Sequence, residues 1–368
     1  MKIILLISSM GAGGAERVAA TLCNAWAKRS NQVTLISTFS GGGKSFYDIS
    51  KNIELIFLAD LVENKKKSFV SSLQRLYILR RLISIRQADV IVSFLSNVNI
   101  AAVIASAFLK SPLIICERSD PSSQPVSRLL RVACKLTYRY ADMLTVQTDS
   151  VVKKVDQIYS GIKLLRAIPN PLPDAIVSIK KNLIAKRRKS LLSLGRLSDE
   201  KQVELIIAAF AKLAFRCADW DLHVYGDGPL KNNILQQIAS LDMQNRIFLK
   251  GRTSEPWQIM ANADAYVMAS RFEGFPNALL EAMGVGLPCV AFDCPSGPRE
   301  ISNDGKDALL VDLNDQQGLI TALEKVMSDE VFRDDLGNRA RKSVLSRYSL
   351  ASILNRWDEL FQQVGVAM

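Results

Sequence analysis

The feature that most constrains the fold of this chain is a repeated alternation between short apolar runs and helical patterns. In the first half the runs read IILLIS, QVTLIST, IELIFL, VIVSFL, LIICE and MLTVQ, and after residue 190 they read SLLSLG, LHVYG, RIFLKG, AYVMAS, PCVAF and ALLVD. Apolar runs that alternate with helices are typical of a parallel sheet covered by helices. The sequence therefore predicts an α/β protein with two doubly wound, Rossmann-like domains.

A stretch rich in proline and basic residues, 169–189, separates the two sets of runs. We interpret it as a linker between a first domain, 1–168, and a second domain, 190–345. A length of 368 residues suits two domains of ordinary size. The last stretch has apolar residues at helical spacing, and we predict a helix, 346–368, that completes the first domain. Packing on the second domain alone is the open alternative.

Charge is distributed unevenly along the chain, whose net charge is +11. Residues 1–190 contain 29 lysines and arginines against 12 aspartates and glutamates, whereas the remainder contains 18 against 24. A basic half is compatible with nucleic acid, anionic lipid or a phosphorylated substrate. No localised nucleic-acid motif or aromatic platform is visible, so we expect no nucleic-acid partner.

Metal and disulfide chemistry have little support in the sequence. The six cysteines form no C-x-x-C pair, and the chain has one histidine, His223. Neither a zinc site nor a disulfide framework is expected. DWD, 219–221, has the spacing of a D-x-D metal motif but precedes its strand, and we predict that it lies on the surface.

Two apolar stretches resemble membrane or targeting segments. Residues 90–109 are uncharged for twenty positions, but their serines and asparagines favour a buried strand followed by a helix capped by Asn97 or Asn99. The beginning, MKIILLISSMGAGG, is better explained by a buried strand and a glycine turn than by a signal peptide.

The glycine turn SSMGAGGAER, 8–17, follows a predicted strand and opens a helix. Gly13 and Gly14 would let backbone amides approach a phosphate. The spacing differs from G-x-G-x-x-G, and no acidic residue ends the next strand, which argues against a nicotinamide dehydrogenase. GGGKS, 41–45, lacks the first glycine of a P-loop, because Thr38 stands there.

The second half contains cations and carboxylates next to predicted helix entrances. Arg196 and Lys201 lie between a strand and a helix, and Pro276 in EGFPNALLE favours the first helical position. Cations and helix amides together suit a diphosphate. Glu273 and Glu281 would then accept hydrogen bonds from sugar hydroxyls. For each of these charged residues, a solvated side chain without a binding role remains the alternative.

These motifs resemble a known family. SRFEGFPNALLEAMGVGLPCVAF, 270–292, is similar to the E-x7-E segment of retaining family 4 glycosyltransferases with the two-domain GT-B fold. GGAER, GRLSDEKQ, YGDGPL, FLKGR and SGPREI occur in the order that this family shows. The resemblance spans nearly the whole chain.

The resemblance implies two domains facing across a cleft, with a nucleotide sugar on the second domain and an acceptor on the first. It places Arg196 and Lys201 at the diphosphate, Glu273 at the donor sugar and Glu281 at the ribose. It also places Gly13 and Gly14 near the phosphates, backbone groups of Phe275, Pro276 and Asn277 at the helix entrance, and Arg252 at the base. The resemblance also implies that anomeric configuration is retained without a protein nucleophile. It implies neither a metal nor another cofactor.

One departure from the family concerns the first domain. Many relatives have a histidine where LIICERSDP, 113–121, has Arg118. The ERSDP segment resembles a subset of transferases that assemble capsule, O-antigen and exopolysaccharide. It makes Glu117, Arg118 and Asp120 candidates for the acceptor side. A buried ion pair that shapes this loop is the open alternative.

Two basic segments, 65–86 and 128–140, mix cations with Phe, Tyr and Leu at helical intervals. They favour helices lying on an anionic membrane surface, with ordinary solvated helices as the alternative. We therefore predict a cytoplasmic enzyme peripherally associated with the inner membrane. It would move a hexose, Gal or GalNAc, from a UDP-linked sugar to a lipid-linked (undecaprenyl-diphosphate type) glycan. The alternative is a nonhydrolysing sugar-nucleotide epimerase, which would need acid/base side chains such as histidine.

Overall fold

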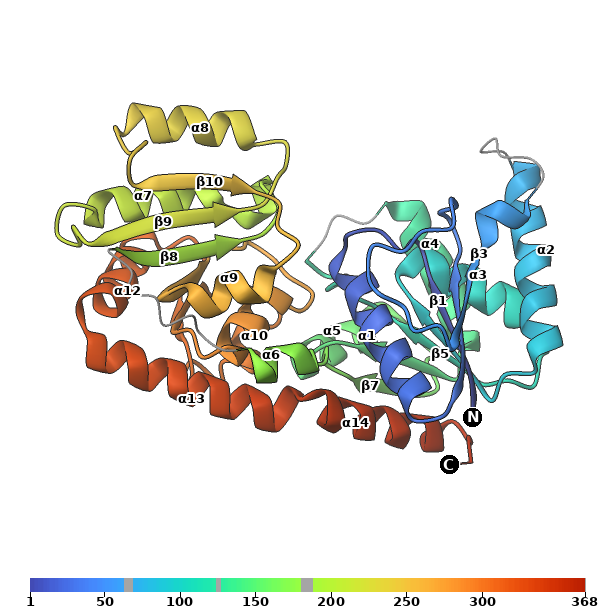
Figure 1. The fold of residues 1–368 in the computed structure, drawn as a ribbon. Helices are drawn as coiled ribbons and strands as arrows, with labels where there is room; N and C mark the ends of the chain where they lie inside the picture. The colour runs from blue at the N-terminus through green and yellow to red at the C-terminus, as the bar shows by residue number, and fades with distance from the viewer. Residues whose placement is uncertain (63–68, 124–126, 180–187, 368) are drawn as a thin grey trace. The chain divides into compact units, whose positions relative to one another are not determined.

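The structure is a computed structural model that describes residues 1–62, 69–123, 127–179 and 188–367. The chain divides into two compact units (Figure 1). The first unit comprises Met1–Pro171 and Ala351–Met368, and the second comprises Leu172–Leu350. Part of the predicted linker, 180–187, and the beginning of the first basic segment, 65–68, lie outside the described residues.

The first unit is built on a seven-stranded sheet with the order β3-β2-β1-β4-β5-β6-β7, in which all neighbouring strands are parallel. The strands are β1 (Lys2–Ile7), β2 (Gln32–Ser37), β3 (Ile53–Phe57), β4 (Val90–Phe94), β5 (Leu113–Cys116), β6 (Met143–Val146) and β7 (Leu165–Ala167). The helices are α1 (Gly14–Lys28), η1 (Leu58–Leu61), α2 (Phe69–Arg86), α3 (Ser96–Ser106), α4 (Arg128–Thr137), η2 (Tyr138–Tyr140), α5 (Asp149–Ile158) and α14 (Leu350–Gln363). Because the strand order reverses at β1, the unit is doubly wound.

Apolar side chains of both faces of this sheet are buried, as the continuous apolar strands predicted. Ile91 and Ile115 belong to one apolar cluster with residues of α2, α3 and α4. The helix α14 packs on α1, where the ring of Trp357 meets Trp26 edge-on at 5.6 Å between centroids. Truncating a buried tryptophan typically costs about 3–5 kcal/mol, so this contact is a substantial part of the unit's stability.

The second unit has a six-stranded sheet with the order β10-β9-β8-β11-β12-β13, again with parallel neighbours. The strands are β8 (Lys189–Leu194), β9 (Trp220–Tyr225), β10 (Ile247–Gly251), β11 (Ala265–Met268), β12 (Cys289–Phe292) and β13 (Leu309–Val311). The helices are α6 (Asp174–Ser178), η3 (Asp199–Lys201), α7 (Val203–Leu213), α8 (Lys231–Ser240), α9 (Pro256–Asn262), α10 (Asn277–Gly284), α11 (Pro298–Ile301), α12 (Gln316–Ser328) and α13 (Glu330–Tyr348).

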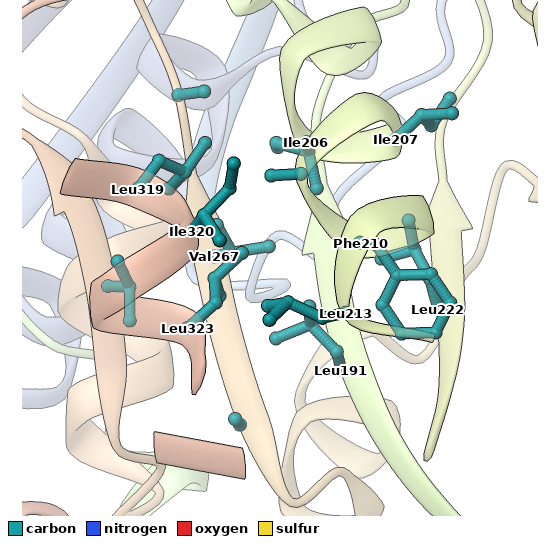
Figure 2. Packing of buried hydrophobic residues seen from close by; sticks show 14 of the residues in the cluster. Leu191, Ile206, Ile207, Phe210, Leu213, Leu222, Val267, Leu319, Ile320 and Leu323 are labelled. Atoms are coloured by element: carbon teal, nitrogen blue, oxygen red, sulfur yellow. The ribbon is translucent and has the colours of Figure 1, made fainter. Parts of the chain in front are cut away.

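Figure 2 shows how one face of this sheet is filled. Leu191 and Val267 project from the adjacent strands β8 and β11 toward Phe210 of α7 and Leu323 of α12. All four side chains are fully buried. The spacing of apolar residues in α7 and α12 therefore fixes which helix faces meet the sheet, and this leaves the carboxyl ends of the strands for the loops that carry polar residues.

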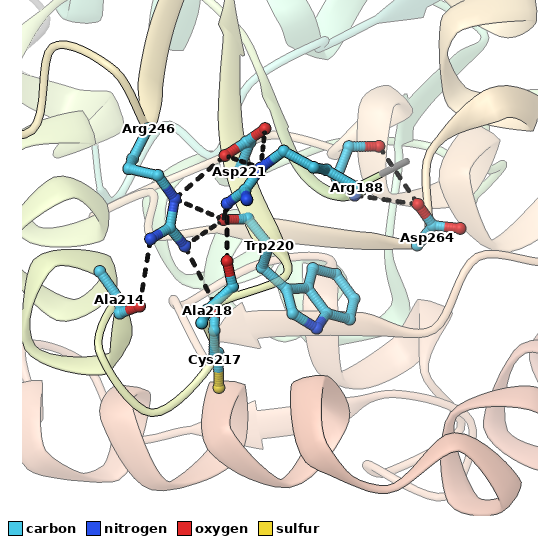
Figure 3. A network of polar contacts seen from close by, with 9 residues as sticks. Arg188, Ala214, Cys217, Ala218, Trp220, Asp221, Arg246 and Asp264 are labelled. Carbon is cyan, nitrogen blue, oxygen red and sulfur yellow. Dashed lines mark hydrogen bonds and ion pairs between the residues drawn. The ribbon is translucent and has the colours of Figure 1, made fainter. Parts of the chain in front are cut away.

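The start of β9 is held by a charged network rather than exposed (Figure 3). Arg188 and Arg246 both bond to the Asp221 carboxylate, at 2.8 and 3.1 Å. Arg246 also donates to the carbonyl oxygens of Ala214 and Cys217. The prediction that DWD, 219–221, lies on the surface is therefore wrong for Asp221, which is 8% exposed, and for the buried Trp220.

Local differences from the sequence-based expectations have simple causes. The stretch expected to be a linker contains the short helix α6, whose Ile176 and the preceding Leu172 lie against Gly284 of α10. The apolar stretch 90–109 forms β4 and α3 as predicted, but neither asparagine caps α3. Its N-cap is Leu95 at φ 80°, and Asn99 is buried, donating to the Cys116 carbonyl oxygen at 3.1 Å.

The end of the chain is not one continuous helix. Ser349, in extended backbone, separates α13 of the second unit from α14 of the first. The short strand β7 was not among the predicted apolar runs, because its three residues are only partly buried or exposed. In the part of the chain that the structure describes, no helix combines the length and apolarity that crossing a membrane requires.

Candidate active site

The carboxyl ends of β8 and β11 bring two predicted residues together in the second unit. These strands are neighbours, so the loops that follow them meet at the same sheet edge. The Arg271 amide donates to the Glu200 carbonyl oxygen at 2.8 Å, which ties the two loops. Lys201 Nζ consequently lies 2.5 Å from Glu273 Oε1.

This ion pair is partly buried, with 27% of the Lys201 side chain and 13% of the Glu273 side chain exposed. The two residues are separated by 71 others in sequence, and their contact was not predicted, although both were assigned to the site. A lysine ammonium has three donors, so it can bind a second anion without leaving Glu273. The pair therefore combines a cation suited to phosphate with a carboxylate suited to a hydroxyl.

Glu281 lies one turn inside α10, as predicted, and is 3% exposed. Trp257 Nε1 donates to its Oε2 at 3.1 Å. Sequence reasoning missed Trp257, although an indole N–H at the beginning of a helix is a group that needs an acceptor once it is buried. The indole fixes one carboxylate oxygen, and this orients the other.

The loop before α10 is clamped by its neighbours. Ser296 Oγ donates to the Gly274 carbonyl oxygen at 2.8 Å. Gly297 has φ 99°, and a Cβ there would lie 2.3 Å from Pro276 Cδ, so both conformation and space require glycine. Phe275 is buried with its ring against Tyr348 at 5.9 Å.

The helix begins one residue later than predicted. Pro276 is the N-cap rather than the first helical residue, and Asn277 begins α10. The first turn of a helix carries N–H groups without intrahelical acceptors, which favour a negative charge. Backbone groups near Asn277 thus remain suited to the predicted role, whereas the Phe275 side chain serves packing.

Of the two predicted arginines of this unit, one follows β8, as Lys201 does, and the other follows β10. Arg196 is exposed after β8, and its side chain forms no hydrogen bond or ion pair with any residue that the structure describes. Arg252 follows β10, has a side chain that is 77% exposed, and lies 3.6 Å from Asp227 through Nε. Neither is in the Lys201–Glu273 pair, so their assignment to diphosphate and base rests on the resemblance.

In the first unit, the predicted glycine turn already holds a carboxylate. Gly13 is the N-cap of α1 and Gly14 its first residue. Glu16 accepts from Ser9 Oγ at 2.8 Å, and a Cβ on Gly13 would come within 2.0 Å of its Oε2. The group closest to Gly13 is therefore the chain's own Glu16, and because its flexible side chain can move aside, space alone does not require glycine here.

The candidate acceptor residues at the end of β5 do not pair with one another. Glu117 is buried and accepts from the Tyr138 hydroxyl and, at 2.9 Å, from Ser96 Oγ. Burial raises the pKa of Glu117, although the hydroxyl donors oppose the shift. Arg118 points elsewhere, with its guanidinium over the ring of Phe94.

Asp120 provides the buried ion pair that the sequence left as an alternative. Its carboxylate lies 3.1 Å from Lys154 Nζ and accepts from the hydroxyls of Ser122 and Ser123 at 2.6 Å each. Burial alone would raise the pKa of Asp120, but these donors outweigh it and lower the pKa. Asp120 therefore shapes the loop that carries Arg118.

Among the residues placed by the structure, no group of three or more His, Cys, Asp or Glu side chains is arranged to hold a metal ion. His223, in β9, has its ring edge-on against Phe248 at 5.5 Å between centroids. All six cysteines are buried as free thiols.

Family models match both units. The model described as Glycosyltransferase Family 4 matches residues 12–175, and the model described as Glycosyl transferases group 1 matches residues 175–343. Together they span nearly the whole chain. They favour sugar transfer over the epimerase alternative.

Two full-length relatives come from Campylobacter jejuni. One is a GalNAc-alpha-(1->4)-GalNAc-alpha-(1->3)-diNAcBac-PP-undecaprenol alpha-1,4-N-acetyl-D-galactosaminyltransferase, 27% identical, with 99% of each chain covered. The other is an N-acetylgalactosamine-N,N'-diacetylbacillosaminyl-diphospho-undecaprenol 4-alpha-N-acetylgalactosaminyltransferase, 29% identical, with 92% of this chain and 94% of the relative covered.

Solved structures share the fold across the whole chain. Anabaena HepE in complex with UDP and glucose has a TM-score of 0.80 at 20% identity, with 98% of this chain and 99% of that chain covered. The lipopolysaccharide outer core galactosyltransferase WaaB in its apo form has a TM-score of 0.73 at 21% identity, with 99% and 100% covered. The chain therefore belongs to family 4 of the glycosyltransferases, has the two-domain GT-B fold, and is a hexosyltransferase.

Proposed function

We propose that this enzyme transfers GalNAc or Gal, with retention of anomeric configuration, from a UDP-linked donor to a lipid-linked glycan of the undecaprenyl-diphosphate type. The observation that carries the proposal is the convergence of Lys201, Glu273 and the buried Glu281 at one sheet edge. Full-length similarity to two transferases named for GalNAc and undecaprenol-linked acceptors favours this donor and this acceptor.

Each group at this edge has a role in the proposal. Lys201 binds the diphosphate beside the first turn of α10, and Arg196 adds a second cation from the end of β8. Glu273 accepts from a donor-sugar hydroxyl. The Glu281 carboxylate, which accepts from the Trp257 indole, also accepts from the ribose hydroxyls. Arg252 lies at the base.

The proposed chemistry needs no protein nucleophile. The bond between the anomeric carbon and the diphosphate oxygen breaks, and the acceptor oxygen bonds to the same face of that carbon. The leaving diphosphate oxygen takes the acceptor's proton, so UDP and the extended glycan are the products. Lys201 and Arg196 stabilise charge that grows on the diphosphate, which is the kind of preorganised electrostatic effect that contributes most in many enzymes.

The surface of the first unit supports a membrane-bound acceptor. Helix α4 and the following turn expose Leu129, Val132, Leu136 and Tyr140, with exposed fractions of 85%, 53%, 61% and 67%. These residues recur at helical spacing, and arginines and lysines lie between them. We propose that this stripe rests on the anionic cytoplasmic face of the inner membrane, so that the enzyme acts as a peripheral membrane protein.

The decisive experiment measures UDP release from UDP-GalNAc, UDP-Gal, UDP-GlcNAc and UDP-Glc, and nucleotide release from GDP- and ADP-sugars, with and without detergent-extracted lipid-linked oligosaccharide. We expect release that depends on UDP-GalNAc or UDP-Gal and on the lipid, and a product with the α configuration by NMR. Conversion of the sugar nucleotide without acceptor, or an inverted product, would overturn the proposal.

Membrane binding is tested separately by sedimentation with vesicles. The wild type should bind vesicles containing phosphatidylglycerol and not vesicles of phosphatidylcholine. Leu129→Ser should weaken this binding several-fold. Val331→Ser is the matched control, because Val331 is 83% exposed but lies on α13 of the second unit. Equal losses for the two variants would contradict the proposed surface.

A further inference from the structure

The carboxyl edge of the first sheet holds an arginine without a carboxylate partner among the described residues. Arg118 follows β5, and its guanidinium carbon lies 4.3 Å from the centroid of the Phe94 ring. One Nη donates to Asn170 Oδ1. Its Nε is buried and makes no hydrogen bond. The guanidinium is thus held in place while part of its donor capacity is unused.

The Arg118 side chain is only partly exposed, and its Nε is buried, so the charge is partly withdrawn from water at a cost. Burial lowers its pKa to about 10, so it remains protonated at neutral pH. A buried charge normally has an opposite charge beside it, because desolvation is otherwise uncompensated. The two acids nearest in sequence are engaged elsewhere: Glu117 accepts from Tyr138 and Ser96, and Asp120 pairs with Lys154.

The neighbours of Arg118 form a polar cluster at the ends of four adjacent strands. Gln147, after β6, donates through Nε2 to Asn170 Oδ1 at 3.0 Å. Gln147 is 5% exposed, and its Oε1 is buried without a hydrogen-bond partner. Asn170 Oδ1 therefore accepts from both Arg118 and Gln147, but as a neutral oxygen it does not balance the charge. Ligands of doubly wound sheets bind at this edge.

We propose that Arg118 binds a phosphate group of one of the enzyme's two diphosphate substrates. Its planar fork of donors matches phosphate geometry, Phe94 fixes the guanidinium plane, and Asn170 fixes its rotation. The inference rests on the proposed function for the identity of those substrates. The phosphate belongs either to the nucleotide or to the lipid-linked acceptor, and binding measurements distinguish the two.

The test measures binding of two probes, UDP and undecaprenyl diphosphate in detergent micelles, to the wild type, Arg118→Gln and Arg118→Lys. We expect Arg118→Gln to weaken one probe about 10- to 100-fold, as for loss of a charge-assisted hydrogen bond. Lysine should restore only part of this, because it offers a point charge without the fork. Loss of undecaprenyl diphosphate binding assigns the acceptor phosphate, and loss of UDP binding assigns the donor phosphate.

Unchanged affinity of Arg118→Gln for both probes would overturn the inference. Arg29→Gln is the matched control, because Arg29, in the same unit, has its own carboxylate partner in Asp358 at 2.9 Å and should leave both affinities unchanged. Thermal unfolding gives a second readout: Arg118→Gln should keep or raise the Tm, since it removes an uncompensated cation. A lowered Tm with unchanged binding would indicate a purely structural arginine.

The inference and the proposed function fail in distinguishable ways. Nucleotide release by the wild type is measured on the same preparation. A wild type that binds undecaprenyl diphosphate through Arg118 but transfers no sugar would contradict the proposed function and keep the phosphate site. An active wild type whose probe affinities are insensitive to residue 118 would contradict the phosphate site alone.

Discussion

Each unit has its own doubly wound parallel sheet, but the charged side chains at the carboxyl edges of the two sheets have different partners. In the second unit, Lys201 is paired with Glu273 and the Glu281 carboxylate is oriented by Trp257. In the first unit, Glu117 is surrounded by hydroxyl donors, and Arg118 has no carboxylate partner among the described residues. We call the carboxyl edges of the sheets in the first and second units the first edge and the second edge. The difference indicates that the second edge is organised before a ligand arrives, whereas the first edge leaves a charge for a ligand to balance.

The largest effect is expected for Lys201→Met. Removing a cation that stabilises charge on the leaving diphosphate should lower kcat about 100- to 1000-fold, with a smaller change in donor KM. Steady-state UDP release measures both constants. Lys250→Met, on β10 of the same unit with its ammonium 4.8 Å from the Phe248 ring, is the control and should keep wild-type kcat.

Because Lys201→Met also leaves Glu273 unpaired, the double variant with Glu273→Gln separates the two effects. If the loss came only from the unpaired carboxylate, the double variant would return to the activity of Glu273→Gln alone. A kcat for Lys201→Met within threefold of the wild type would remove this pair from the chemistry and with it the proposed contrast between the edges.

Glu281→Gln should have the next largest effect. The amide preserves shape but replaces a charged acceptor, so UDP affinity should fall about 10- to 100-fold. The wild type should bind UDP more tightly than 2′-deoxy-UDP, and the variant should lose most of this preference. Isothermal titration of both nucleotides checks the result. An undiminished preference would place the ribose elsewhere.

The sequence was sufficient to predict the fold class and the residue types of the second edge, because both depend on short motifs and apolar periodicity. It did not predict the contact between Lys201 and Glu273, which depends on β8 and β11 being neighbours in the sheet order. Trp257 was missed because its acceptor lies on α10, and the packing of α9 against α10 is likewise not written in the local sequence. Strand order is set by packing of the whole unit and leaves no local signal.

At the first edge, the sequence failed to predict the side-chain partners for a different reason. For Glu117, Arg118 and Asp120, a buried ion pair that shapes their loop was the alternative to a role on the acceptor side. In extended backbone, however, successive side chains point to opposite sides, so adjacent residues face different neighbours. Glu117 consequently meets Tyr138 and Arg118 meets Phe94. The ion pair of the loop is made instead by Asp120 and Lys154, which are 34 positions apart.

The buried Glu117 gives the first unit a specific pH dependence. Its pKa is raised by burial, so the folded state binds the proton more tightly than the unfolded state. Its contribution to stability is complete below the ordinary carboxyl pKa and is lost as pH rises through the raised value. Relative to Glu117→Gln, the wild type should therefore lose stability between pH 5 and pH 8, as measured by urea unfolding.

Glu54→Gln is the control, because the pKa of Glu54 is shifted in the opposite direction from that of Glu117. Arg86 donates to Glu54 and lowers its pKa despite partial burial, so its contribution is present above the ordinary carboxyl pKa and is lost only on acidification. The difference between wild type and Glu54→Gln should be constant from pH 5 to pH 8. A constant difference for Glu117→Gln as well would show that Glu117 is ionised in the folded protein, and its burial would then not distinguish the first edge.

The smallest effect is expected for Trp257→Phe, which removes the indole donor and keeps an aromatic ring. Since Trp257 acts through Glu281, UDP affinity should fall about three- to tenfold, corresponding to one ordinary hydrogen bond, while kcat stays unchanged. In a Glu281→Gln background the same substitution should have no further effect on UDP affinity. Additive losses would mean that Trp257 contacts the nucleotide directly, and a loss of kcat would mean that it supports the fold of the loop. Coupling without either outcome would establish that the second edge orients its carboxylate through its own chain. Arg118 is likewise oriented by Phe94 and Asn170, but it has no carboxylate partner among the described residues.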